Sequence, residues 1–279
     1  MILPQDELRK LTELKHRAPH AILGLHPRSD VPGLVARAFF PNAAKVELRS
    51  LAAADKASFE LQRIHKTGLF EGATDAATKV FKYELVITDD KGNSRSIRDP
   101  YSFLPTLSEE DLYLFGKGDE RKLYDKLGAQ LRTVDGVAGT SFAVWAPNAQ
   151  RISVVGDFNN WDGHVHQMRS LGSSGVWEIF IPGVGEGAHY KFELRDHNNH
   201  IRLKADPCGF FMEVPPKQAS IVWNNKKFKW TDDAWLKKRK KTNPLQAPVS
   251  TYELHIGSWR KKSKAESFGY RELAAPLVA

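Results

Sequence analysis

The sequence is poor in cysteine and contains no long apolar run. Cys208 is the single cysteine among 279 residues, so no internal disulfide can form, which fits a reducing compartment. No apolar run approaches the roughly 20 residues that cross a bilayer. Charged side chains stand where a signal peptide needs its apolar stretch: Asp6, Glu7, Arg9 and Lys10. We therefore expect a cytoplasmic protein with no membrane partner.

The composition is that of a globular protein, with 41% hydrophobic and 27% charged residues. A net charge of +8 is compatible with a polyanion partner, but the positive charge is spread along the chain, apart from one run at 237–241. Such a run is more often a solvated helix or linker than a polyanion site. We expect no nucleic-acid partner, and neutral polar substrates stay compatible with this surface.

A repeated pattern organises the chain. Pro-Asn-Ala follows an alternating apolar segment at Pro41 and again at Pro147, 106 residues later. Residues 82–85 match residues 191–194 with an offset of 109 residues. An Asp-Pro pair follows in each half, at residues 99–100 and 206–207, with an offset of 107 residues. These nearly constant offsets predict one ancestral unit that occurs twice.

Each repeated unit has the pattern of an all-β module. Residues 141–145 and 151–155 alternate apolar and polar side chains, as half-buried strands do, and Gly-rich turns separate such segments. Several short strands in about 90 residues suggest a β-sandwich of immunoglobulin-like size. We expect a mostly β protein with two tandem sandwiches, at residues 16–105 and 126–225.

Connecting segments flank these units. Residues 1–15 carry leucines at three-residue spacing, which predicts a short amphipathic helix that caps the first unit: Leu8, Leu11 and Leu14. Residues 106–125 have Ser108 before an acidic run, which predicts a partly helical linker. Residues 226–249 end in two X-Pro pairs, a pattern typical of a domain boundary.

The last segment, 250–279, resembles the start of a further domain. Residues 249–260 have the pattern of a buried strand, and 269–277 that of a helix. Strand, loop and helix open an α/β domain, but an eight-stranded barrel needs about 250 residues. We expect these last residues to be poorly packed and aggregation-prone, because an unpaired strand edge promotes association.

The segment 156–162 carries the most informative side chains. Trp161 follows a strand and a turn, and an exposed indole can stack on the flat face of a sugar while amides bond its hydroxyls. Asn159 and Asn160 supply such amides, and Lys191 adds a donor from a neighbouring strand. The more frequent alternative is structural, because a Trp beside a turn often packs on its own sandwich and Asn-Asn is ordinary turn chemistry.

No other group of residues in the sequence has the spacing of a metal site or a catalytic site. His164 and His166 flank one residue, but spacing supplies no third ligand, so we predict no metal site. Ser141 and Ser258 lack the context of a nucleophile elbow, and no Gly-rich phosphate loop is present. Single Asp and Glu residues in loops do not define a carboxylate pair for glycoside chemistry. We predict no catalytic residue in this chain.

Six stretches resemble bacterial glycogen (1,4-α-glucan) branching enzymes, and the resemblance runs from about residue 15 to the last residue. They agree in order and spacing, which makes the resemblance highly specific. The stretches are 20–26, 98–103, 140–149, 156–163, 175–183 and 252–260.

The resemblance implies an architecture and an activity. It implies two N-terminal β-sandwich modules, the second a glycogen-binding module of type 48, and then a barrel of the α-amylase superfamily (glycoside hydrolase family 13). Such enzymes cut an α-1,4-glucan, hold it as a covalent glycosyl-enzyme and transfer it to a 6-hydroxyl, which forms an α-1,6 branch in glycogen biosynthesis. The family requires no cofactor. Its catalytic Asp and Glu lie on later barrel strands, so this chain alone is predicted to be inactive.

The resemblance also bears on partners. It implies glucan contact through Trp161 and Lys191, whereas residues 197–201 lack the second stacking Trp that such modules often carry. The implied partners are α-1,4-glucan and the remaining barrel of the same protein, which we expect to be monomeric. The alternatives are a free-standing glycogen-binding or scaffold module, or part of a related enzyme such as a debranching enzyme. The barrel-like end at 250–279 and the repeated first unit argue against them.

Overall fold

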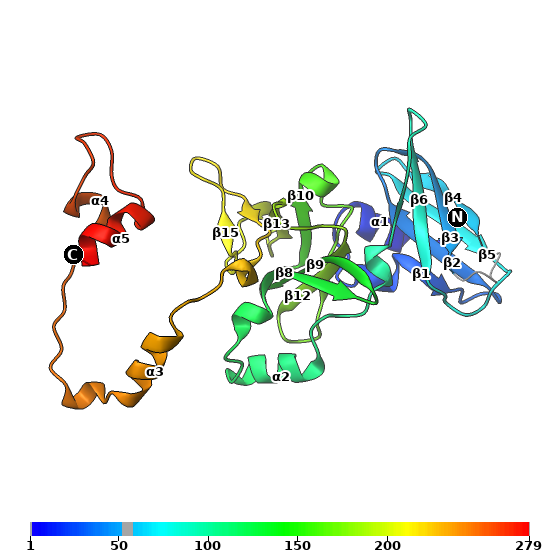
Figure 1. Cartoon of the computed structure of the whole chain (residues 1–279). Coiled ribbons are helices and arrows are strands. Elements are labelled where there is room, and N and C mark those ends of the chain that lie inside the picture. The colour runs from blue at the N-terminus through cyan, green and yellow to red at the C-terminus, as the bar shows by residue number, and fades with distance from the viewer. Residues whose placement is uncertain (1, 52–57, 279) are drawn as a thin grey trace. The chain divides into compact units, whose positions relative to one another are not determined.

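The computed structural model describes residues 2–51 and 58–278. The chain divides into two compact units, Met1–Asn225 and Lys226–Ala279 (Figure 1). Strands dominate the first unit and helices the second, so the expected mostly β protein is confirmed. Within the described residues, no helix has both the length and the apolar character needed to cross a bilayer.

The first module of unit one contains α1 (Gln5–Thr12) and seven antiparallel strands in one sheet. The order across the sheet is β1-β2-β5-β4-β3-β6-β7. The sheet is continuous because β4 pairs with β5 on one side and with β3 on the other. The strands are β1 Gly24–Pro27, β2 Leu34–Phe39, β3 Ala43–Ser50, β4 Phe59–His65, β5 Leu69–Thr74, β6 Tyr83–Asp89 and β7 Ser94–Ile97.

The second module has two separate antiparallel sheets. One has the order β11-β12-β9-β8; in the other, β10-β13-β16-β15 are in line and β14 also pairs with β13. Phe142 and Ile179 of the first sheet share one buried cluster with Ile152 and Phe192 of the second, as in a β-sandwich. The strands are β8 Gly128–Val134, β9 Val137–Trp145, β10 Arg151–Gly156, β11 Arg169–Ser170, β12 Val176–Pro182, β13 His189–Arg195, β14 Ile201–Lys204, β15 Phe211–Met212 and β16 Ser220–Ile221.

One buried hydrogen bond recurs in both modules. The Tyr83 hydroxyl donates to Asp99 Oδ2 at 2.6 Å, and the Tyr190 hydroxyl donates to Asp206 Oδ2 at 2.6 Å. Tyr83 is the first residue of β6 and Tyr190 the second of β13, and each of these strands pairs with the strand after Pro-Asn-Ala. The repeat is therefore real, with an offset of 107 residues at this strand.

The sequence pairing of residues 82–85 with 191–194 is wrong by two residues. The structure pairs Ser50 with Tyr83 in the first module and Gly156 with Tyr190 in the second, so Tyr83 corresponds to Tyr190. A slip of two residues leaves every side chain on the same face of a strand. The alternation of apolar and polar residues in the sequence therefore cannot distinguish the two alignments.

Helix α1 joins the two modules. Its buried Leu8 and Leu11 belong to the cluster that also holds the second module's core. Arg195 of β13 donates from Nη2 to the Glu13 carbonyl at 2.8 Å and from Nε to the Leu14 carbonyl at 3.1 Å. Glu13 is the C-cap of α1 and Leu14 follows it, so the second module holds the end of the helix that was predicted to cap the first unit.

The linker between the modules contains the predicted helix, α2 (Glu109–Lys117). Ser108 and Asp111 form a capping box: the Asp111 N–H donates to Ser108 Oγ at 3.1 Å, and the Ser108 N–H donates to Asp111 Oδ2 at 2.8 Å. Gly118 ends the helix in the left-handed conformation. Both helix ends are thus encoded locally.

Unit two corrects one prediction. The expected strand over 249–260 is absent; residues 250–255 have no strand pairing, and α4 (Ile256–Trp259) follows. A strand of a parallel barrel exists only through hydrogen bonds to its neighbours, and the described part of the chain supplies none here. The basic run lies in helix α3 (Asp233–Lys241), and the predicted C-terminal helix is α5 (Tyr270–Val278).

Candidate functional site

The residues selected from the sequence gather at one end of β10. We call residues 156–163 the Asn-Trp loop. The strand ends at Gly156, one 3-10 turn covers Asp157–Asn159, and the next two residues adopt left-handed φ angles of 54° at Asn160 and 59° at Trp161. Asn tolerates this conformation, but for a bulky residue it is an outlier that costs about 1–3 kcal/mol and clusters at functional sites.

Asn159 holds this strained loop from inside. The side chain is buried; Oδ1 accepts from the Gly156 N–H at 2.9 Å, and Nδ2 donates to the Val154 carbonyl at 2.9 Å and to His166 Nδ1 at 2.9 Å. Its carboxamide is thus committed to loop geometry. A direct contact of Asn159 with a sugar stays a prediction.

The loop also packs on the outer face of the β10–β13 pair. The Gly163 carbonyl accepts from Ser153 Oγ at 2.6 Å and from Arg151 Nη2 at 3.3 Å. Arg151 is fully buried and pairs with Glu193 at 2.8 Å. A Cβ at position 163 would collide with that carboxylate, so a larger residue there would have to displace Glu193 from Arg151.

Trp161 and Lys191 remain open on this surface. Trp161 is 39% exposed, and within the described residues its indole N–H has no acceptor and its ring no aromatic partner. Lys191 pairs with Val155, on the strand face opposite the inward-facing Tyr190 and Phe192. Its ammonium group makes no ion pair to any residue that the structure describes. Both side chains therefore lie where a ligand can reach them.

Two histidines beside the loop have pKa values that are shifted in opposite directions. Burial lowers the pKa of His166 to about 3, so its ring is neutral; because Nδ1 accepts from Asn159, its proton lies on Nε2. Burial also disfavours the charged form of His164, but the bond from Nδ1 to Asp162 Oδ1 at 2.7 Å, the negative charge of Asp162 and the contact with the Thr12 carbonyl together outweigh it and raise the His164 pKa. His164 Nε2 lies 3.1 Å from the Thr12 carbonyl, so the pair ties the loop to α1.

These histidines do not form a metal centre. His164 and His166 each bond a different partner in the loop. Among the residues that the structure describes, no three His, Cys, Asp or Glu side chains are grouped as metal ligands.

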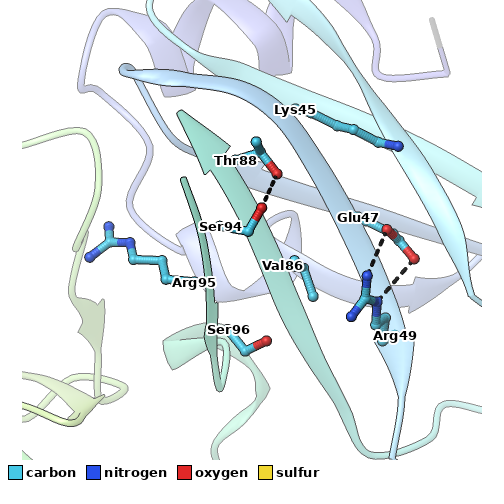
Figure 2. A pocket seen from close by; sticks show the side chains of 8 residues that line it. All are labelled: Lys45, Glu47, Arg49, Val86, Thr88, Ser94, Arg95 and Ser96. Atoms are coloured by element: carbon cyan, nitrogen blue, oxygen red, sulfur yellow. Dashed lines mark hydrogen bonds and ion pairs between the residues drawn. The ribbon is translucent and has the colours of Figure 1, made fainter. Parts of the chain in front are cut away.

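The first module carries a different pocket on the outer face of β3, β6 and β7. Figure 2 shows this pocket of about 250 Å³, in which Arg49 binds Glu47 through two hydrogen bonds of 3.1 and 3.2 Å and Thr88 bonds Ser94 at 2.8 Å. These polar groups satisfy one another across a strand surface. Arg95 is the exception, because its side chain points away from the other labelled residues.

Comparisons with known proteins assign both modules. Residues 4–101 match the family model "alpha-1,4-glucan branching enzyme GlgB, N-terminal domain", and residues 126–209 match "Carbohydrate-binding module 48 (Isoamylase N-terminal domain)". The GlgB enzyme of Rubrobacter xylanophilus is 45% identical over 275 residues, which is 98% of this chain and 37% of that protein. GlgB of Myxococcus xanthus is 44% identical over 277 residues, again 98% of this chain and 37% of the relative.

The chain thus spans about 37% of the length of the curated relatives that it matches. The matches include both modules and continue beyond them toward the end of the chain. This chain therefore belongs to the bacterial 1,4-alpha-glucan branching enzyme family, of which it corresponds to the N-terminal part.

Proposed function

We propose that the protein of which this chain is the N-terminal part is a 1,4-α-glucan branching enzyme of glycogen biosynthesis. The observation that carries the proposal is identity of 45% over 98% of the chain with a protein of that name. The reaction moves a segment of α-1,4-glucan to a 6-hydroxyl and needs no cofactor. The carboxylates that perform it belong to the barrel, so the chain alone is inactive.

Within that enzyme, the role of this chain is to contact α-glucan through the second module. The exposed indole of Trp161 stacks on a glucose ring, and the open ammonium of Lys191 and the amide of Asn160 donate to its hydroxyls. Asn159 supports the contact by holding the strained loop. The strain at Trp161 supports this assignment, because packing alone does not require a left-handed Trp.

The domain assignment belongs to the same proposal. The N-terminal helix occupies residues 1–15, and immunoglobulin-like modules occupy 16–105 and 126–225. Linkers occupy 106–125 and 226–249, and the first βα unit of the catalytic barrel begins in 250–279. The Tyr–Asp bond repeated in both modules supports a common fold for them. The complete enzyme acts as a cytoplasmic monomer without nucleic-acid partners.

Affinity electrophoresis in gels that contain glycogen tests the glucan contact. The wild-type chain should be retarded, and Trp161→Ala should lose most of the retardation, because stacking of one ring contributes about 0.5–1.5 kcal/mol in addition to the apolar area that it buries. Trp145→Ala is the matched control: Trp145 is a 54% exposed Trp on β9 of the same module and is not part of the loop.

Equal retardation of wild type and Trp161→Ala would remove the indole from the proposed contact. An assay for new α-1,6 branches covers the other half of the proposal. Branch formation by the 279-residue chain alone would contradict the assignment of catalysis to the barrel.

A further inference from the structure

A cleft of about 660 Å³ lies between the two modules of unit one. The first module lines it with the ends of β3, β6 and β7; the second lines it with the Asn-Trp loop and the end of β12. Its volume falls in the range of roughly 300–1,000 Å³ that is typical of small-ligand sites. Apolar wall area comes from both modules, including Phe40 and Phe158.

Hydrogen-bond donors without protein acceptors line this cleft. Arg95 and Arg98 make no ion pair or hydrogen bond to any described residue, and Arg98 Nε is shielded from solvent. His166 also lines the cleft, and its neutral ring carries the proton on Nε2 because Nδ1 is occupied by Asn159. The charge of Arg95 is close enough to His166 to contribute to its lowered pKa, so Arg95 reaches toward the second module.

Acceptors line the same cleft. Asp89 and Asp162 bring carboxylates that already accept hydrogen bonds from residues 91–93 and from His164 but keep further lone pairs, and Asn160 brings an amide that no described residue engages. The two arginines and two aspartates cancel in charge, and the carboxylates disfavour an anion such as phosphate. Sugar hydroxyls donate and accept at once, so a neutral mixture of donors and acceptors with apolar walls fits their chemistry.

We propose that this cleft between the modules binds a short segment of linear α-1,4-glucan. The choice of ligand rests on the proposed function, whereas the choice of site rests on the cleft itself. Asn160 and Asp162 line the cleft, and Trp161 lies between them in the chain. The cleft therefore adjoins the Trp161 surface. It forms a second glucan site, at the boundary between the first and the second module.

Calorimetric titration of the full chain with maltoheptaose tests the cleft. Arg95→Gln should weaken binding about tenfold, because one charge-assisted hydrogen bond is lost. Arg95 is exposed, so the variant should fold. Arg49→Gln is the matched control, because Arg49 lies on the outer face of the same module and already binds Glu47. Amide chemical shifts should move at residues 93–98 and 160–166.

The outcomes separate the cleft from the Trp161 surface. Weaker binding by Arg95→Gln with unchanged binding by Trp161→Ala supports the cleft and refutes the role of Trp161. The reverse pattern overturns the cleft and leaves the proposed function intact. Absence of maltoheptaose binding by wild type overturns it as well. Shifts at 93–98 with inorganic phosphate but not with maltoheptaose would replace the glucan by an anion.

Discussion

The two modules share one internal bond and differ in sequence just after the neighbouring strand. Tyr83–Asp99 and Tyr190–Asp206 are buried pairs with the same 2.6 Å distance and the same position in the repeat. Beyond the equivalent strand end, the first module's sequence from 51 to 58 has no aromatic residue, where the second has the Asn-Trp loop. The shared bond stabilises the fold of both modules, and the Asn-Trp loop gives the second module side chains that the first lacks at this point of its sequence.

The position of Lys191 follows the same rule. In the first module Glu84 occupies that place, paired with Arg49 across β3 and β6 as Lys191 is with Val155 across β10 and β13. The first module has thus kept the strand register while carrying the opposite charge at this position. The comparison predicts that glucan contact depends on the second module's loop and strand pair.

Acidification should have the largest effect on stability, and it should act on a feature that both modules share. His166 in the second module is buried, and the half-buried His20 in the first has both ring nitrogens shielded from solvent; this desolvation lowers the pKa of both, to about 3 for His166, so both rings are neutral. The unfolded chain binds protons below its ordinary histidine pKa near 6.5, so stability should fall as pH drops from there toward 3. Each group costs up to about 1.4 kcal/mol per pH unit.

The titration of Asp99 changes the stability of the fold in the opposite direction. Burial raises its pKa from 3.8 to about 6, so the folded state binds the extra proton between these values and gains stability as pH falls. Urea unfolding between pH 7 and 4 should therefore give a shallower acid loss in His166→Gln than in wild type. Gln keeps an acceptor for Asn159 but does not titrate. Equal slopes for the two proteins would refute the assignment to His166.

Removal of the tyrosine hydroxyls tests whether the shared bond is equivalent in the two modules. Tyr83→Phe and Tyr190→Phe should each lower the free energy of unfolding by about 1–3 kcal/mol, because a buried carboxyl loses its hydroxyl donor. Each carboxyl keeps one backbone donor, Tyr101 N–H for Asp99 and Cys208 N–H for Asp206. Urea denaturation measures both changes; a loss in only one variant would break the equivalence.

The sequence predicts features that are encoded locally or repeated. The offsets at Pro41 and Asp99, the helix after Ser108 and the loop around Trp161 all depend on local residue types, and the structure contains each of them. The two-residue error at Tyr190 arose because alternation has a period of two.

Features that depend on distant partners could not be read in this way. The strand over 249–260 was wrong because the apolar pattern of a barrel strand becomes a strand only beside its neighbours. The cleft depends on the packing of two modules, and no spacing along the chain encodes it. The partners of Asn159 are three to seven residues away, but residue types alone do not tell whether an amide in a turn faces inward or toward solvent.

The smallest expected effect sharpens the comparison most, because it uses matched positions. Lys191→Gln should weaken glycogen affinity about twofold to fivefold, since one partly exposed charged donor is lost and its net contribution is about 0.5–1 kcal/mol. Glu84→Gln, at the equivalent place in the first module, should leave the affinity unchanged. Affinity electrophoresis against glycogen compares the two with wild type. If both variants bind glycogen as tightly as wild type, the strand pair β10–β13 has no part in recognition, and any contact is confined to the loop. If Glu84→Gln alone changes binding, the first module carries the glucan surface, and the division of labour between the two modules is reversed.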